Sequence, residues 1–103
     1  MGITKAEALK AVDRERGPVC EASDRIWDQP DTAFQEFHST DVLCELLEKE
    51  GFRVERNLAG IATAFSGTYG SGKPVVGILG EFDALSGLSQ ESESLEKTAL
   101  VDG

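Results

Sequence analysis

The first part of the chain carries apolar residues at helical spacing. Between Thr4 and Asp28, one apolar stripe runs between charged faces and consists of Leu9, Val12, Val19 and Ile26. Gly17 and Pro18 interrupt the pattern, because a proline inside a helix removes one hydrogen bond and clashes with the preceding turn. The sequence therefore predicts either one kinked helix or two helices, the second with Pro18 in its first turn.

A second helix is predicted after a connecting turn at residues 28 to 34. One face of this helix is apolar and comprises Val42, Leu43, Leu46 and Leu47. Ser39 or Thr40 is suited to cap its start, and Asp41 suits the positive end of the helix dipole.

The end of this helix is predicted at Gly51. A glycine in the left-handed conformation commonly follows the last turn of a helix, because it has no side chain to clash with the backbone. We expect Phe52 to fold back onto Leu47, which is the usual hydrophobic contact of that ending.

From Phe52 onward the pattern changes to that of strands. Residues 52 to 56 are short and alternating, residues 61 to 69 carry apolar side chains at period two, and residues 74 to 80 ("PVVGILG") are almost continuously apolar. The last run predicts a central strand buried on both faces. "GSGK" at 70 to 73 has the length of a hairpin turn, so the second and third strands are predicted to be antiparallel neighbours. Two helices followed by about three strands open an α/β layered domain.

The remainder of the chain, after Leu85, is polar, acidic and weakly patterned, and we expect a loop or tail. Residues 94 to 100 could form a short helix. A length of 103 residues with 40% apolar residues predicts one small domain or a piece of a larger one.

The net charge of −9, from 19 acidic and 10 basic residues, argues against nucleic acid and anionic membranes as partners. The N-terminal residues contain no long apolar run, so we expect neither a secretory signal nor a membrane anchor, and a cytoplasmic protein. Cys20 and Cys44 have no histidine at metal-ligand spacing, which predicts reduced, partly buried thiols.

Residues 67 to 74 ("GTYGSGKP") have the spacing of a phosphate-binding loop, with Gly67, Gly72 and Lys73 in place. Pro74 stands where that loop needs a serine or threonine for the magnesium ion. The residues that follow favour a strand, whereas a phosphate loop leads into a helix whose free N–H groups hold the phosphate. A plain turn is therefore the favoured interpretation.

Two carboxylates follow the predicted central strand. Glu81 and Asp83 lie at its C-terminal end, where open α/β sheets usually place ligands and catalytic groups. A solvated strand end, with one residue capping the next turn, is the simpler alternative. His38 is the only histidine, and without partners at the required spacing it favours a surface or helix-end role over a zinc site.

Residues 26 to 90 resemble the N-terminal part of the M20 metallopeptidase and amidohydrolase family, in particular the amidohydrolases similar to aminobenzoyl-glutamate utilization protein B. The ordered run from "GIATAF" through "YGSGKPVVGILGEFDALSGLSQ" carries the resemblance. It implies that residues 1 to 90 form a partial catalytic domain of the layered α/β/α kind, and that 91 to 103 are an acidic loop or tail.

The resemblance also implies chemistry. Family members hydrolyse amide bonds in small N-acyl amino acids, dipeptides or folate fragments, using one or two divalent metals, and have an inserted dimerisation domain. In the family's pattern Asp83 lies beside the metal centre and orients a ligand histidine, while Glu81 occupies a position that is a histidine ligand in some branches. Ser86 departs from the pattern, which usually has a proline there.

The metal ligands of that pattern, a G-H-x-C-G-H motif and later glutamates and histidines, are absent from this sequence. We therefore expect an amidohydrolase segment that is inactive alone, with zinc or manganese held only by the complete protein and none stably by this chain. A small amide or dipeptide substrate and a homodimer are expected for the complete protein. The alternatives are a non-catalytic α/β module for assembly and, on the loop spacing only, a nucleotide binder.

Overall fold

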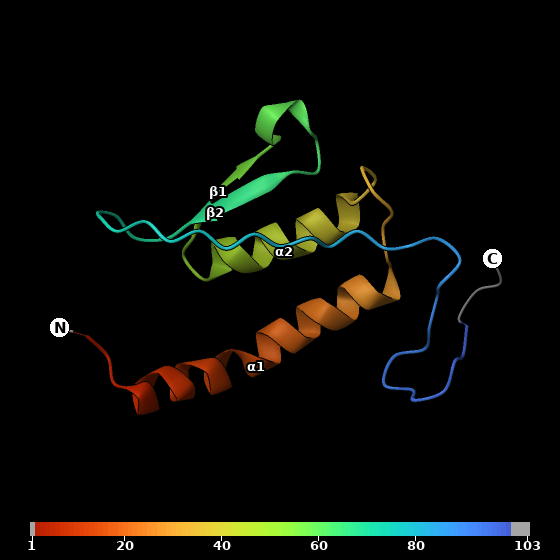
Figure 1. Cartoon of the computed structure of the whole chain (residues 1–103), viewed down its shortest axis with the longest axis horizontal. Helices are drawn as coiled ribbons and strands as arrows, with labels where there is room; N and C mark the ends of the chain where they lie inside the picture. The colour runs from red at the N-terminus through yellow and green to blue at the C-terminus, as the bar shows by residue number, and fades with distance from the viewer. Residues whose placement is uncertain (1, 100–103) are drawn as a thin grey trace.

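The computed structural model describes residues 2 to 99. Helix α1 (Lys5–Asp28) and helix α2 (Phe37–Lys49) precede strand β1 (Arg53–Arg56), the short 3-10 helix η1 (Leu58–Gly60) and strand β2 (Phe65–Thr68), as Figure 1 shows. Two helices followed by an antiparallel hairpin confirm the predicted α/β fold class.

Helix α1 is one continuous helix with Pro18 inside it, so the first of the two predicted alternatives holds. Its start is closed by a capping box, in which the Thr4 hydroxyl accepts the Glu7 N–H while the Glu7 carboxylate accepts the Thr4 N–H. Ala22 is buried, whereas Leu9, Val12 and Val19 of the predicted stripe are more than half exposed. Most of the stripe is therefore exposed, although Val19 and Ile26 border the space between α1 and α2.

Helix α2 begins earlier than predicted. Its first residue is Phe37, and Ser39 and Thr40 lie buried within the first turn, so neither of them is the cap. The carboxylate of Asp31, in the preceding loop, instead accepts the Ser39 N–H at 2.8 Å. Capping by a more distant loop residue satisfies one of the free N–H groups that every helix start leaves.

The end of α2 confirms the prediction. Gly51 has a φ of +91°, its N–H donates to the Glu48 carbonyl, and the Phe52 N–H donates to the Leu47 carbonyl. Leu47 and Phe52 also converge on Gly67 of β2, where an added Cβ would lie 3.0 Å from the Leu47 side chain and 3.5 Å from the Phe52 ring. The turn after α2 thus sets the hairpin against the helix.

The hairpin joins β1 to β2 and not the second predicted strand to the third. The strands are antiparallel, with Val54 opposite Gly67 and Arg56 opposite Phe65. The chain reverses between them through Asn57 and Ala59, both at positive φ, and the Leu58 N–H donates to the Ala64 carbonyl. This longer connection escaped the sequence analysis because it lacks a two-residue turn signal.

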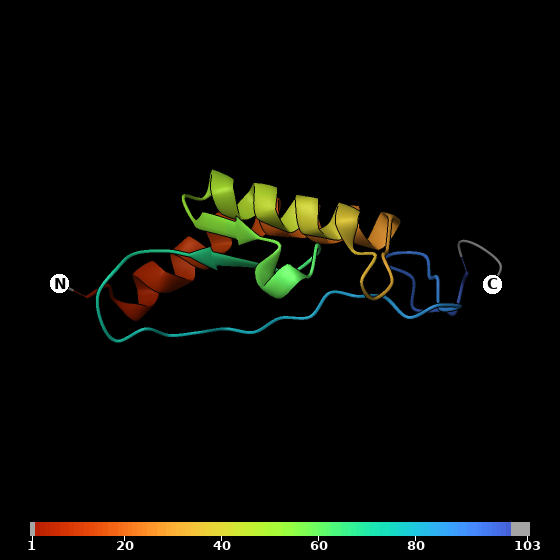
Figure 2. The same ribbon diagram turned by 90° about the horizontal axis from the view of Figure 1, so that it is seen from above.

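The predicted central strand at 74 to 80 is not formed in the described part of the chain, and its burial was predicted wrongly. These residues run extended past the helices and the hairpin (Figures 1 and 2), and Ile78 and Leu79 are 96% and 93% exposed. A strand buried on both faces needs neighbouring strands and a covering layer. Residues 94 to 99 likewise form no helix, and Leu100, the end of that suggested helix, lies outside the described residues.

Candidate functional site

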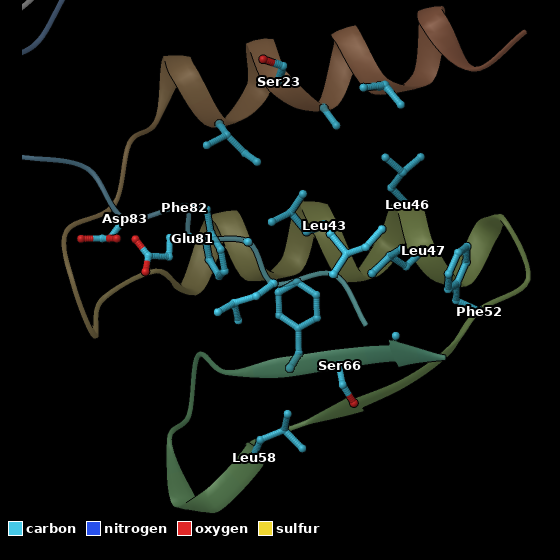
Figure 3. A pocket seen from close by; sticks show the side chains of 18 of the residues that line it. Ser23, Leu43, Leu46, Leu47, Phe52, Leu58, Ser66, Glu81, Phe82 and Asp83 are labelled. Carbon is cyan, nitrogen blue, oxygen red and sulfur yellow. The ribbon is translucent and has the colours of Figure 1, made fainter. Parts of the chain in front are cut away.

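An open cavity of about 1890 Å³ lies between α1, α2, β2 and the extended segment. Figure 3 shows Leu43, Leu46 and Leu47 of α2 directed into it, with Phe52 at one end. The carboxylates of Glu81 and Asp83 lie at the opposite end from Phe52 (Figure 3). The cavity is far larger than an ordinary ligand pocket, and its apolar lining is that of an uncovered core.

The two predicted carboxylates are brought to one place. Glu81 and Asp83 are both exposed, while Phe82 between them is half-buried and packs on Phe65 with ring centroids 5.7 Å apart. Both carboxylates also line a small groove of about 200 Å³, which they share with Glu36 at the start of α2. The groove is therefore acidic and open to solvent.

The backbone just after Asp83 is fixed to the loop before α2. The Ala84 N–H donates to the Asp31 carbonyl at 2.7 Å, and Thr32 and Ala84 form an isolated parallel β-bridge. Further along, the Trp27 indole N–H donates to the Gln90 carbonyl at 2.7 Å. The end of α1, the loop before α2 and residues 82 to 90 thus meet in one junction.

Glu36 is a further acidic group of this junction that the sequence analysis did not select. Its carboxylate accepts the Thr63 hydroxyl at 2.6 Å and the Phe34 N–H at 2.8 Å. The hydroxyl, followed by the N–H of Phe34, lowers the pKa of Glu36, because both donors stabilise the ionised form. Thr40 strengthens the same link by donating to the Thr63 carbonyl at 2.9 Å.

The other candidate residues lie elsewhere. His38 is in the first turn of α2, and its Nε2 lies 3.2 Å from the Arg25 carbonyl, which fits the predicted helix-end role. Cys44 is fully buried in α2, whereas Cys20 is exposed on α1, so partial burial was wrongly predicted for Cys20. Burial raises the pKa of the Cys44 thiol, and the nearby Arg56 guanidinium opposes that rise.

Asp31 and Glu36 are the site residues that sequence reasoning missed. The signal for Asp31 was an acidic residue in the loop before a helix, and it was overlooked because it lies eight residues before the N–H that it caps. The signal for Glu36 was weaker still, since its partner Thr63 is 27 residues away.

Neither a metal nor a phosphate group fits the residues present. Across residues 2 to 99, no group of three or more histidine, cysteine, aspartate or glutamate side chains is arranged to hold a metal ion, and a catalytic zinc site usually needs about three protein ligands. The glycine-rich residues 67 to 74 lead into the extended segment and not into a helix, so the N–H donors of a phosphate loop are missing. None of the helices described between residues 2 and 99 is long and apolar enough to span a membrane.

Fold and site together define an α/β segment with an uncovered apolar face and a carboxylate at the end of an apolar run. Comparison with known proteins finds a relative of this segment. The chain is 43% identical, over 93 residues, to a subunit of the p-aminobenzoyl-glutamate hydrolase of Escherichia coli (strain K12). The match covers 90% of this chain and 19% of that protein, so the chain spans about a fifth of the relative's length. No family model matches the chain. The similarity confirms the predicted resemblance to amidohydrolases of the aminobenzoyl-glutamate type.

Proposed function

We propose that the chain is the N-terminal segment of a metal-dependent amidohydrolase that cleaves amide bonds of small N-acyl amino acids or dipeptides. The observation that carries this proposal is the 43% identity over 90% of the chain to an amidohydrolase subunit. The relative's name suggests an aminobenzoyl-glutamate amide as the first substrate to try. Residues 1 to 90 would be part of the catalytic domain, and the segment alone would be inactive.

The uncovered apolar face supports the proposal. Val75, Val76, Ile78 and Leu79 are each more than four-fifths exposed, and burying such side chains is worth about 1.5 to 3 kcal/mol each. The chain spans about a fifth of the relative's length, and in a protein as long as that relative the remaining residues would cover this face. The apolar run would then become the buried strand that its composition predicts.

Asp83 would serve as the support of a ligand histidine outside this chain. A carboxylate that accepts the second ring N–H of a ligand histidine fixes its tautomer and direction. The exposed position of Asp83, with Phe82 and Ala84 anchored on either side, supports this role. The divalent metal, zinc or manganese, would be held by residues that lie outside the described chain.

Partners and location are part of the same proposal. The relative is named as a subunit, which supports an assembly of more than one chain. For the complete protein we propose a homodimer in the cytoplasm, acting on a small molecule and not on nucleic acid or a membrane. The net charge of −9 supports the exclusion of polyanionic partners.

The test begins with the coding sequence beyond Gly103. A continuation that contains a G-H-x-C-G-H motif supports the proposal, and a natural stop codon there favours the non-catalytic assembly module. With the complete protein, Asp83→Ala is assayed for amidase activity and metal content beside Asp24→Ala, an exposed aspartate of α1. We expect the first substitution to lower kcat by about tenfold or more and the second to leave it unchanged. Full activity in Asp83→Ala would refute the role of that residue.

A further inference from the structure

The segment that carries Asp83 has few attachments of its own. Residues 74 to 81 are exposed and belong to no strand, so their backbone does not hold Asp83 in place. Two contacts follow: the ring of Phe82 packs on Phe65, and Ala84 bonds to the loop before α2. The position of Asp83 therefore depends on the Phe82 contact on one side and, on the other, on what fixes that loop.

Asp31, like Glu36 at the end of the same loop, is held at both its backbone and its side chain. Its carbonyl accepts the Ala84 N–H at 2.7 Å, and its Oδ2 accepts the Ser39 N–H at 2.8 Å. Ser39 is fully buried in the first turn of α2, and the N-terminal end of a helix favours a carboxylate through its free N–H groups and its dipole. One residue thus links a rigid helix start to the backbone that follows Asp83.

We propose that Asp31 is a positioning residue, which fixes Asp83 relative to the start of α2. Without the Asp31 carboxylate, the loop at 29 to 36 loses its attachment to Ser39. The Ala84 backbone, which is hydrogen-bonded to this loop, then moves with the loop. The carboxylate of Asp83 then samples several positions, and an imidazole that depends on it loses its orientation. The catalytic part of this inference rests on the proposed function, whereas the coupling between Asp31 and Ala84 does not.

The coupling is measured on this chain by amide hydrogen exchange, read by NMR at Ser39 and Ala84. We expect Asp31→Ala to speed exchange at both amides by about fivefold, the equivalent of a lost helix cap. Asp31→Asn, which keeps an oxygen acceptor, should restore most of the protection. The matched control Asp24→Ala should change neither amide. Faster exchange at Ser39 with no change at Ala84 would overturn the proposal.

If Asp31→Ala does not fold, as judged by loss of its helical circular dichroism, the coupling is still testable on the unmodified chain. In low concentrations of denaturant, Ser39 and Ala84 should lose protection together, with the same dependence on denaturant, because one opening event exposes both. Different dependences would overturn the proposal without any variant.

The catalytic arm uses the complete protein. We expect Asp31→Ala to lower kcat by about tenfold while KM changes by less than about twofold, and Asp31→Asn to recover most of kcat. A purely structural role would lower the amount of folded enzyme and leave kcat per active site unchanged, and that result would overturn the proposal. A complete protein with no amidase activity would refute the proposed function, while the exchange results would still decide the coupling.

Discussion

The indole N–H of Trp27 donates a 2.7 Å hydrogen bond to the carbonyl of Gln90, 63 residues further along the chain. Trp27 lies in the last turn of α1, so this bond attaches the C-terminal part of the described chain to the first helix. The Gln90 side chain meanwhile donates to the Glu96 carbonyl and accepts the Thr98 N–H. Backbone and side chain of Gln90 thus serve two different attachments.

The two attachments are separable by mutation. Trp27→Phe keeps an aromatic ring but removes the donor, so we expect the segment around Gln90 to leave α1. Gln90→Ala keeps the carbonyl that Trp27 uses and should loosen only the loop that contains Thr98. Amide exchange at Glu91 and Thr98 reports the loop, because the Glu91 N–H donates to the Thr98 carbonyl. We expect faster exchange of several-fold in Gln90→Ala, and equal rates in Gln90→Ala and the parent chain would contradict this assignment.

The two thiols should react at very different rates. Cys20 is exposed and Cys44 has no exposed surface, so a thiol reagent reaches Cys44 only after local opening. We expect one fast equivalent and one slower by on the order of 100-fold when the native chain is treated with a chromogenic disulfide. Cys20→Ser should abolish the fast phase. Two fast equivalents in the native chain would contradict the burial of Cys44 in α2.

Cys44 should also make stability depend on alkaline pH. Burial raises the pKa of its thiol in the folded chain, whereas an unfolded thiol titrates near pH 8.5. Below that pH the thiol keeps its proton in both the folded and the unfolded chain, so the stability contributed by the buried neutral thiol is fully present. As the pH rises further, the unfolded chain releases this proton first, and the free energy of unfolding falls. Thermal unfolding from pH 7 to 10 should therefore show a steeper loss for the parent chain than for Cys44→Ala. Parallel curves would contradict the prediction.

Acid should weaken the link between Glu36 and Thr63. Because its hydrogen bonds lower the pKa of Glu36, the stabilisation is present above the unfolded value of about 4.3 and is lost as the pH falls through the lower folded value. We expect Glu36→Gln to show a shallower loss of stability between about pH 5 and 3. Thr63→Val should have a lower Tm at neutral pH, whereas the exposed Thr68→Val should not. An unchanged Tm in Thr63→Val would rule out this link.

Gly51 should resist replacement. An L-residue in the left-handed conformation is destabilised by about 1 to 2 kcal/mol relative to glycine, and Gly51 has a φ of +91°. We expect Gly51→Ala to lower the free energy of unfolding by about 1 kcal/mol and Gly51→Asn to lower it less, since asparagine tolerates this conformation better. Denaturant unfolding measures both. Equal stability of Gly51→Ala and the parent chain would contradict the strained geometry.

Local signals predicted best. The end of α2 was predictable because Leu47, Gly51 and Phe52 lie close together in the sequence, and their interaction needs nothing from the rest of the chain. The run at 74 to 80 was predicted as a buried strand because its composition reflects neighbours on both sides. Among the described residues no strand pairs with this run on either side, so the same composition here gives an exposed extended segment.

The candidate site was half predictable. Asp83 and Glu81 could be selected because they follow an apolar run, a position defined by adjacent residues. Asp31 and Glu36 act through Ser39 and Thr63, and which loop reaches which helix start is a tertiary contact. Periodicity along the chain does not encode such pairs, so these two residues emerged only from the folded structure.

The bare apolar run has a practical consequence for the chain in solution. Val75, Val76, Ile78 and Leu79 combine high β-propensity with no charge, which is the composition of segments that stack into cross-β aggregates. Pro74 at one end and Glu81 at the other act as gatekeepers, because proline cannot extend a ladder and stacked carboxylates repel each other. The chain should therefore stay dispersed at low salt, and Glu81→Gln, which removes this charge, should promote fibril formation.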